Sequence, residues 1–200
     1  MVTHESINKN QESVSASRLR VAVTAALFAA LTFLGTYLIK VPTITKGYIH
    51  PGDGFVLLSG IFLGPFWGSL AAGFGSMLSD LIGGYITYVP ATFVIKALVA
   101  AIASGLVGLI QRFTQNRRNV IPVIAGGVVA EAFMIIGYFV FETFLTAFTS
   151  QGGLDPSSLN AALATSAAGI PANLLQAVFG VIIAAVLYPL LSPLVNRQFH

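Results

Sequence analysis

The sequence predicts an all-α integral membrane protein, a bundle of six transmembrane helices with both termini in the cytoplasm. Hydrophobic residues make up 56% of the 200 residues and charged residues only 8%, whereas roughly a quarter of an ordinary soluble domain is charged. Long uncharged apolar segments also recur along the chain, and about 20 apolar residues suffice to cross a bilayer. A soluble core of this size could not bury so much apolar surface, so we expect lipid around the chain.

Each predicted helix is an apolar segment bounded by polar or turn-forming residues. The six segments are 21–39, 54–63, 66–82, 90–110, 121–148 and 171–191. The second is about 15 Å long at 1.5 Å per residue, too short for about 30 Å of hydrocarbon, and the turn Gly64-Pro65 separates it from the third. Residues 150–168 are predicted to be a polar connector with a short helical piece.

Two polar segments flank the predicted six-helix membrane domain of residues 18–192. Residues 1–17 lack the apolar core of a signal peptide and are predicted to be a disordered cytoplasmic tail, and residues 193–200 a second cytoplasmic tail. Cations concentrate in cytoplasmic loops, and only Lys40 and Lys46 would lie outside if the N-terminus is inside. The cations that this topology places in the cytoplasm are Arg18, Arg20, Arg112, Arg117, Arg118 and Arg197.

Ionisable and polar residues inside the predicted helices are the best candidates for a binding site. Each ionisable group costs about 2.5–3.5 kcal/mol on insertion scales and therefore needs a reason to be there. In the N-in topology Lys96, Glu142 and Asn173 lie at comparable depth in the outer half of three helices. These helices would bring polar groups toward one outward-opening region. The candidate substrate-binding residues are Lys96, Glu131, Glu142, Asn173, Gln176, Tyr85, Tyr88 and Tyr138.

Simpler roles remain open for most of these side chains. Lys96 and Glu131 could form an internal ion pair that only fixes helix packing. Glu142 could extend to the interface, and Asn173 could cap its helix. Tyr85 and Tyr88 fit an aromatic belt as well as a lid over a flat ligand.

Small residues on the first helix indicate a contact with another helix. Alanines recur at four-residue spacing and adjoin further alanines, which lets a second helix approach closely. The alternative is packing within the same chain. The alanines are Ala22, Ala25, Ala26, Ala29 and Ala30.

Several kinds of chemistry lack their sequence signals, and we expect no enzyme. The chain has no cysteine, no G-x-S-x-G elbow, and neither an H-E-x-x-H zinc motif nor a G-x-x-x-x-G-K-[ST] phosphate loop. No catalytic residue, metal site or cofactor is therefore expected in this chain. Its basic residues form no patch with interleaved aromatics, so nucleic-acid binding is not predicted.

The segment PGDGFVLLSGIFLGPFWG at residues 51–68, continuing to Ser79-Asp80, resembles the S components of energy-coupling factor (ECF) vitamin transporters of the riboflavin and hydroxymethylpyrimidine type. The likeness extends more loosely over residues 18–192. It implies a six-helix, multi-pass protein of a prokaryotic cell membrane whose outward pocket is bounded by the last three helices and the loops. It also implies that first-helix alanines, here Ala22, Ala26 and Ala30, contact a transmembrane coupling subunit, and that ATP is hydrolysed by two cytoplasmic partner ATPases.

These observations predict a subunit that captures a small water-soluble vitamin or precursor for such an importer. The mixture of both charge signs with tyrosines favours a neutral aromatic heterocycle with hydroxyl groups, similar to pyridoxine or hydroxymethylpyrimidine, with riboflavin as a further candidate. A self-sufficient carrier that uses Glu131 as its proton site is one alternative. A structural subunit without a ligand is the other.

Overall fold

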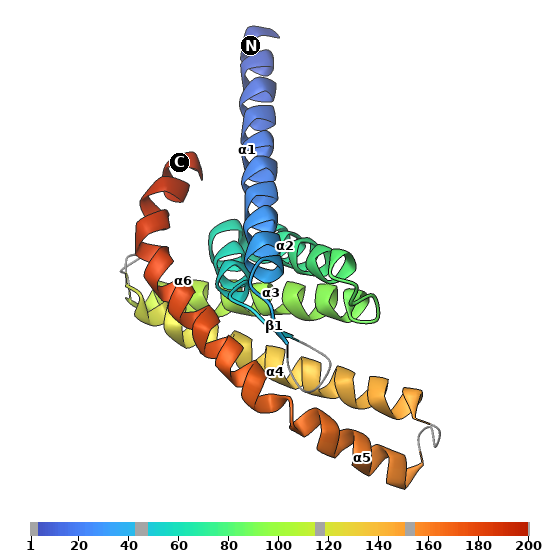
Figure 1. Cartoon of the computed structure of the whole chain (residues 1–200). Coiled ribbons are helices and arrows are strands. Elements are labelled where there is room, and N and C mark those ends of the chain that lie inside the picture. The colour runs from blue at the N-terminus through green and yellow to red at the C-terminus, as the bar shows by residue number, and fades with distance from the viewer. Residues whose placement is uncertain (1–3, 43–47, 115–118, 151–154, 200) are drawn as a thin grey trace.

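The computed structural model describes residues 4–42, 48–114, 119–150 and 155–199. Six helices and two short strands follow one another in the order α1, β1, β2, α2 to α6 (Figure 1). Lys46, Arg117 and Arg118, which the topology prediction used, lie outside these residues. The elements are α1 (His4–Tyr37), β1 (Val41–Pro42), β2 (Tyr48–Ile49), α2 (Asp53–Ile82), α3 (Val89–Thr114), α4 (Ile121–Thr149), α5 (Pro156–Ala167) and α6 (Ile170–Phe199).

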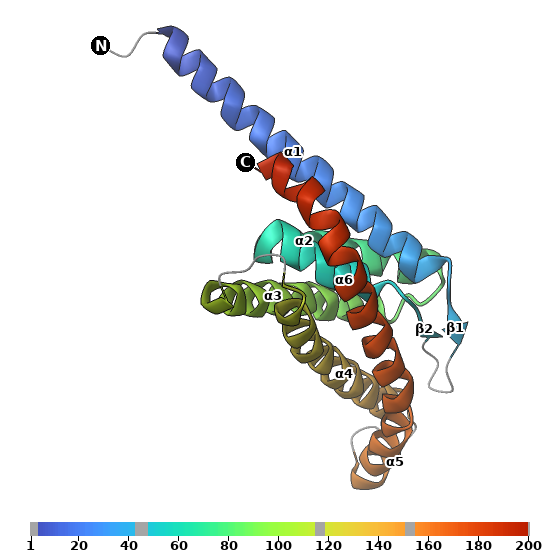
Figure 2. The same cartoon turned by 90° about the vertical axis from the view of Figure 1, so that its left-hand side faces the viewer.

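Helix α1 is longer than the sequence predicted, because it begins at His4 inside the segment expected to be a disordered tail. Residues 4–17 are polar but contain neither proline nor glycine, so nothing in them breaks a helix once the apolar part has formed. The part apolar enough to cross a membrane is Ser15–Tyr37. The N-terminal part of α1 extends beyond the other helices in two perpendicular views (Figures 1 and 2). At the other terminus α6 continues to Phe199, so the predicted tail at 193–200 is helical up to that residue.

Helix α2 contains the predicted break. Gly64 has φ 80° and ψ 177°, a backbone conformation that glycine adopts readily and other residues rarely do. Pro65 follows and has no backbone N–H to continue the helical ladder. The two arms meet closely, since the Ser59 hydroxyl donates to the Gly68 carbonyl at 3.0 Å. The predicted helices 54–63 and 66–82 are therefore the two arms of α2.

The described residues contain five helical stretches long and apolar enough to cross a membrane, not the six separate spans that the sequence predicted. The number is lower because two of the predicted helices are joined in α2, a single bent helix of 30 residues. The predicted connector contains α5, whose N-cap Asp155 accepts from the N–H groups of Ser157 and Ser158. Its side-chain hydrogen bonds to these serines lower the pKa of Asp155 to about 2.

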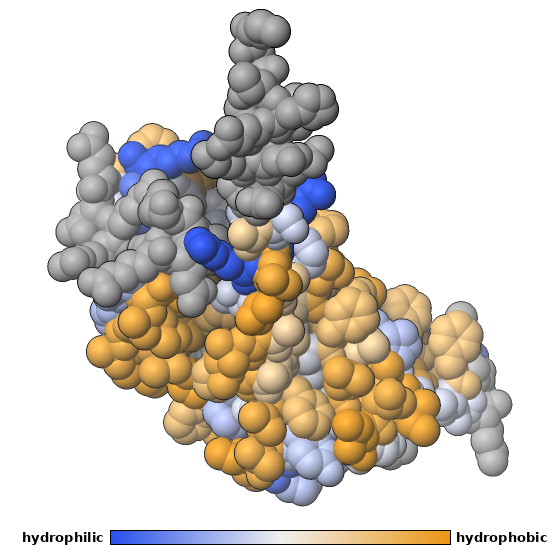
Figure 3. All heavy atoms as spheres, turned by 90° about the horizontal axis from the view of Figure 1, so that it is seen from above, coloured by the Kyte–Doolittle hydropathy of each residue, from blue (hydrophilic) through white to orange (hydrophobic). Residues whose placement is uncertain are grey.

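The polarity of the molecule is inverted relative to a soluble protein. Large apolar side chains such as Phe66, Phe113 and Leu190 are more than half exposed, and apolar residues dominate the face seen in Figure 3. Charged Asp53 and Lys96, in contrast, are 0% exposed. Lipid suits the apolar surface, and buried charge inside a membrane protein marks functional or structural sites.

Close helix packing brings the site together. Helix α2 packs against α1, α3 and α6, and α4 packs against α3, α5 and α6. A Cβ on Gly60 would lie 2.0 Å from the Ala100 carbonyl oxygen, so only glycine lets the first arm of α2 approach α3 this closely. Between α1 and α2, strands β1 and β2 pair antiparallel with Val41 opposite Ile49 and Pro42 opposite Tyr48.

Candidate functional site

A pocket opens at the end of the bundle where α1 and α2 end and α3 and α6 begin. Its volume is about 490 Å³ when the open space at its mouth is included. Polar and aromatic side chains from seven segments surround it. They are Thr36, Tyr48, His50, Asp80, Tyr85, Tyr88, Thr92, Tyr138, Glu142, Asn173 and Gln176.

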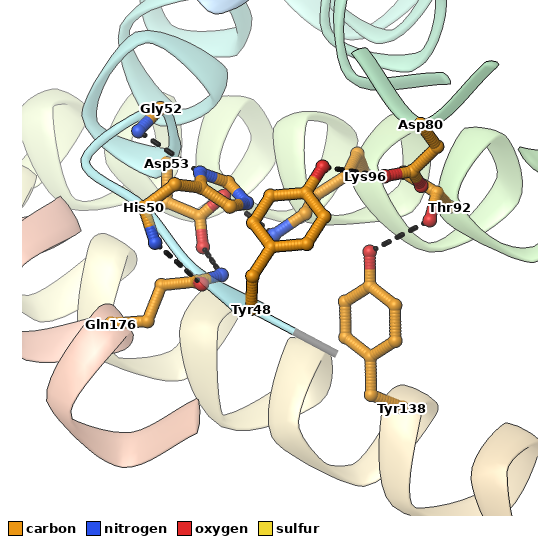
Figure 4. Close-up of polar contacts among 9 residues, drawn as sticks. All are labelled: Tyr48, His50, Gly52, Asp53, Asp80, Thr92, Lys96, Tyr138 and Gln176. Carbon is orange, nitrogen blue, oxygen red and sulfur yellow. Dashed lines mark hydrogen bonds and ion pairs between the residues drawn. The ribbon is translucent and has the colours of Figure 1, made fainter. Parts of the chain in front are cut away.

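Beneath the pocket lies a fully buried ion pair. Lys96 Nζ on α3 is 2.5 Å from Asp53 Oδ1 at the N-terminus of α2, and both side chains are 0% exposed. Gln176 Nε2 on α6 donates to Asp53 Oδ2 at 2.7 Å. Both carboxylate oxygens of Asp53 are thus satisfied, and Figure 4 shows the three side chains converging from three helices. The pair holds α2, α3 and α6 together under the pocket.

His50 connects this ion pair to the loop above it. Its backbone N–H donates to Gln176 Oε1 at 3.1 Å, and its Nδ1 accepts from the Gly52 N–H at 3.1 Å. Burial, reinforced by the positive charges of Lys96 and Lys40 and opposed by Asp53, lowers the pKa of His50 to about 3. His50 is therefore neutral at physiological pH and acts as a hydrogen-bonding wall residue.

The mouth of the pocket is built around Tyr48 on β2. Its hydroxyl donates to Asp80 Oδ1 at 2.5 Å, and burial, with the negative charge of Asp80, raises the pKa of Tyr48. Lys40 Nζ donates to the Ser79 carbonyl at 3.1 Å and lies over the rings of Tyr48 and Tyr85, 4.3 and 5.4 Å from their centroids. The short hairpin thus fixes one aromatic wall of the pocket.

The opposite wall comes from α4 and the loop before α3. The Tyr138 hydroxyl donates to Thr92 Oγ1 at 3.1 Å, and Lys96 Nζ lies 5.3 Å from the centre of the Tyr138 ring. Tyr88 hydrogen-bonds the Glu142 side chain, and burial together with that carboxylate raises the pKa of Tyr88. The ring of Tyr88 packs edge-on against Tyr85 and also contacts α4. Four tyrosine rings thus surround the pocket.

The structure brings together six of the eight substrate-binding residues predicted from the sequence. Tyr85, Tyr88, Tyr138, Glu142, Asn173 and Gln176 all line the pocket. Lys96 does not line it, because its ammonium group is bound to Asp53 below. Contact of Lys96 with a ligand therefore stays a prediction, whereas its ion pair is with Asp53 and not with Glu131, the partner suggested from the sequence.

Glu131 is not among the residues that line this pocket, but it is buried close enough to Asp53 and Lys96 to interact with both. It lines an apolar groove between α4 and α6, together with Ala132, Leu174 and Val178. Its side chain is 1% exposed, and neither of its carboxylate oxygens has a hydrogen-bond partner among the described residues. A Cβ on Gly180 would lie 3.3 Å from Glu131 Oε1 and 2.8 Å from Asp53 Cβ, so α6 packs closely against both carboxylates.

Sequence reasoning did not select five residues of the lining. Tyr48 and His50 lie in a loop with no periodicity, and Thr36 and Thr92 are polar residues that helices accommodate at little cost. Asp80 lies near the end of α2, where its carboxylate accepts from the Tyr48 hydroxyl. The position of Asp53 at the start of a short apolar helix is the sequence feature that could have indicated the buried ion pair.

The pocket is suited to binding, since aromatic faces, hydroxyls, amides and carboxylates surround it without an activated nucleophile. Within the described parts of the chain, no group of three or more His, Cys, Asp or Glu side chains could hold a metal ion. The polar groups can orient a small aromatic molecule through hydrogen bonds while the tyrosine rings stack on it.

A sequence model of the S component family of ECF-type riboflavin transporters matches residues 17–193 of the chain. The chain belongs to this family. Its fold also resembles a solved S component of a bacterial ECF transporter, with a TM-score of 0.59 and 21% identity over 90% of this chain and 99% of the other. At that identity the likeness shows the fold alone.

One curated relative of this S component is an uncharacterized protein in the gap 3′ region of Pyrococcus woesei. The two are 34% identical over 105 residues, which are 52% of this chain and 65% of that protein. The match thus spans less than two thirds of the relative's length. Family membership makes this S component a membrane-embedded transport subunit and supports vitamin capture as its role.

The alanines of α1 in this S component divide between two faces. Ala22, Ala26 and Ala30 are exposed, so a four-residue ladder of small side chains is open to a neighbouring helix. Ala25 is 8% exposed and belongs to the core, which agrees with the alternative of packing within the same chain. Ala29 is partly buried and packs toward α2, where a Cβ on Gly75 would lie 2.4 Å from the Ala29 carbonyl oxygen.

Proposed function

We propose that this S component captures a small water-soluble vitamin or vitamin precursor from outside the cell and delivers it for import. A molecule of the size of pyridoxine or hydroxymethylpyrimidine is preferred, and riboflavin is the alternative. The capture site is the pocket at the end of the bundle. The role as a membrane-embedded transport subunit follows from the family, while the choice of ligand is our inference from the residues that line the pocket.

The observation that carries the proposal is the convergence of polar side chains in a molecule whose surface is apolar. Tyr138 and Glu142 come from α4, and Asn173 and Gln176 come from α6. Both helices carry exposed apolar side chains on their outer faces. Polar groups at such positions are costly in a membrane, and convergent polar groups in a pocket are a common sign of a small-molecule site.

Delivery requires partners in this proposal. The exposed ladder of Ala22, Ala26 and Ala30 would contact a transmembrane coupling subunit, and two cytoplasmic ATPases would hydrolyse ATP. The S component itself would carry no cofactor. The proposal includes an N-in, C-in topology in the plasma membrane of a prokaryote, with the pocket facing outward.

The test is ligand-dependent stabilisation of the purified S component in detergent, with pyridoxine, hydroxymethylpyrimidine and riboflavin as probes. A true ligand at a hundredfold excess over its Kd should stabilise the protein by about 2.7 kcal/mol. Asn173→Ala should weaken that ligand about three- to tenfold, because a neutral hydrogen bond contributes about 0.5–1.5 kcal/mol. Asn160→Ala, the same change at an exposed position of α5, should leave affinity unchanged. If no probe stabilises the folded protein, or if both variants bind as the wild type does, the proposed site is wrong.

A second function, a self-sufficient proton-coupled carrier, is favoured by Glu131. A buried carboxyl group with two unpartnered oxygens is a plausible proton site inside a membrane. Uptake of the same probes by the chain alone, in ATP-free liposomes with a proton gradient, would support this function. Uptake that requires the coupling subunit and ATP would reject it.

A further inference from the structure

The charged side chains that line the pocket bear on the charge of its ligand. Among the described residues, the lining contains two carboxylates, Asp80 and Glu142, and no lysine or arginine. The mixture of charge signs that the sequence indicated depended on Lys96, which the structure pairs with Asp53 below the pocket. The lining is therefore acidic, and a neutral ligand no longer follows from it.

The two carboxylates differ in how well they are satisfied. Asp80 accepts from the Tyr48 hydroxyl at 2.5 Å, and the ammonium group of Lys40 lies over the ring of the same tyrosine, 4.3 Å from its centre. Glu142 is 7% exposed, and its Oε2 is buried with no hydrogen-bond partner among the residues that the structure describes. An ionised buried carboxylate without a cation is costly, so Glu142 is the group that a ligand would complete.

Glu142 also lies where two hollows meet. The second hollow, about 830 Å³ with its open side, shares Tyr85, Tyr88 and Glu142 with the pocket. Its other polar wall residues are hydroxyl-bearing, and the Oγ of Ser166 is likewise buried and unpartnered within the described chain. A ligand in the pocket that extends toward α5 would pass the carboxylate of Glu142.

Tyrosine rings complete the environment of a positive charge. Tyr85 and Tyr88 line both hollows, and Tyr48 and Tyr138 line the pocket. The faces of such rings attract cations within about 6 Å of the ring centre. Lys40 already occupies such a position, with its Nζ 4.3 Å from the centre of the Tyr48 ring. A carboxylate between aromatic rings is a favourable site for an organic ammonium or a charged ring nitrogen.

We propose that the ligand of this S component carries a cationic nitrogen group, which binds Glu142 Oε2 at the junction of the pocket and the second hollow. The inference rests on the proposed function and narrows its substrate class from vitamins in general to cationic or amine-bearing aromatic molecules. Glu142 supplies the countercharge, the tyrosine rings the surrounding faces, and Asn173 and Gln176 the neutral hydrogen bonds of the same pocket.

The test compares two molecules of one shape. Pyridoxamine and pyridoxine differ at one substituent, an ammonium group in the first and a hydroxyl in the second. Their affinities for the purified full-length protein are measured by calorimetry in detergent. A hydrogen bond to a charged group contributes about 1.5–3 kcal/mol, so pyridoxamine should bind about 10- to 100-fold more tightly.

Glu142→Gln should remove this preference and bring the two affinities within about threefold of one another. The matched control is Asp155→Asn, which removes one negative charge from the half-buried N-cap of α5, outside the lining of both hollows, and should leave the preference unchanged. If Glu142→Gln does not fold, the ratio measured on the wild type still decides the question. Equal affinities, or tighter binding of pyridoxine, overturn the inference and leave the proposed function intact.

If neither molecule binds, thiamine, a permanent cation, and riboflavin, which is uncharged, replace them as probes. Thiamine binding that Glu142→Gln weakens at least tenfold supports the inference. Riboflavin binding that this substitution leaves unchanged overturns it while the capture function stands. Failure of all four molecules to bind the folded protein overturns the inference together with the proposed function.

Discussion

Replacing Lys96 by methionine should destabilise the protein more than any change in the pocket walls. The substitution keeps the length and apolar stem of the side chain and removes its charge. It leaves Asp53, which is 0% exposed, with the neutral Gln176 as its remaining partner. A buried carboxylate would then have to stay ionised without a cation or take up a proton.

The magnitude follows from the geometry of the pair. Two unit charges 2.5 Å apart attract each other by about 7 kcal/mol at an effective dielectric constant of about 20. Desolvation of both groups offsets most of this attraction, so the pair adds little compared with two apolar residues. Removal of one partner alone typically costs about 3–5 kcal/mol, because the other charge stays buried.

Thermal unfolding in detergent, followed by circular dichroism, measures this loss. For a chain of this size about 1 kcal/mol corresponds to 2–4 °C, so Lys96→Met should lower Tm by about 6–20 °C. Arg112→Met removes a cation from an exposed position on the same helix and should change stability by less than about 0.5 kcal/mol. The double variant Asp53→Asn with Lys96→Met should regain most of the lost stability.

Two results would refute this reasoning. The first is a Lys96→Met protein as stable as the wild type, which would mean that the pair is solvated or absent. The second is a double variant whose loss equals the sum of the two single losses, since interacting residues must show a coupling energy.

Three further predictions concern the partner face, pH and helix packing. Ala26→Leu should weaken co-purification with the coupling subunit while ligand affinity stays constant, because the larger side chain blocks the close approach of another helix. Ala164→Leu on α5 is the control. Equal loss of co-purification and ligand affinity in Ala26→Leu would indicate that Ala26 packs within the chain instead. In the folded protein the pKa of His50 is about 3, so as pH falls below 6.5 His50 takes up a proton in the unfolded chain but not in the folded one. Stability should therefore fall by about 2 kcal/mol between pH 6.5 and pH 5, and His50→Asn should remove this part of the pH dependence; an unchanged pH profile in the variant would contradict the assignment. Gly60→Ala should cost about 1–3 kcal/mol in thermal unfolding, because its Cβ would meet a backbone oxygen of α3 at 2.0 Å. Gly105→Ala, where nothing lies within 4 Å, should instead stabilise the helix slightly, and similar effects of both changes would argue against the close approach.

Features encoded locally could be predicted from the sequence. The apolar segments and the break at Gly64-Pro65 follow from composition and from the backbone properties of glycine and proline. Glu142 and Asn173 could be assigned to one region because both are costly in lipid and lie at similar depth in the N-in topology. The helical period and the thickness of the membrane are enough to predict the helix face and depth of these residues, without knowledge of tertiary contacts.

Features that depend on tertiary packing could not be predicted in the same way. The sequence suggested Glu131 as the partner of Lys96, whereas the structure pairs Lys96 with Asp53, because the N-terminus of α2 lies against α3 in the folded bundle. Tyr48 enters the pocket only because β1 and β2 pair, and two-residue strands leave no periodic signal. The helical residues 4–17 lack apolar character, so composition alone placed them outside the fold.

The buried ion pair of Asp53 and Lys96 lies below the pocket and carries no net charge, so it separates the residues that stabilise the fold from the residues that line the pocket. The buried charges cancel below the cavity, whereas the side chains that the proposed function assigns to the ligand lie above them. If that function holds, substitutions at positions 142 and 173 should change which nutrient is bound and leave the buried pair intact. The same bundle could serve different nutrients as its walls diverge, while the sealed pair of charges beneath stays fixed.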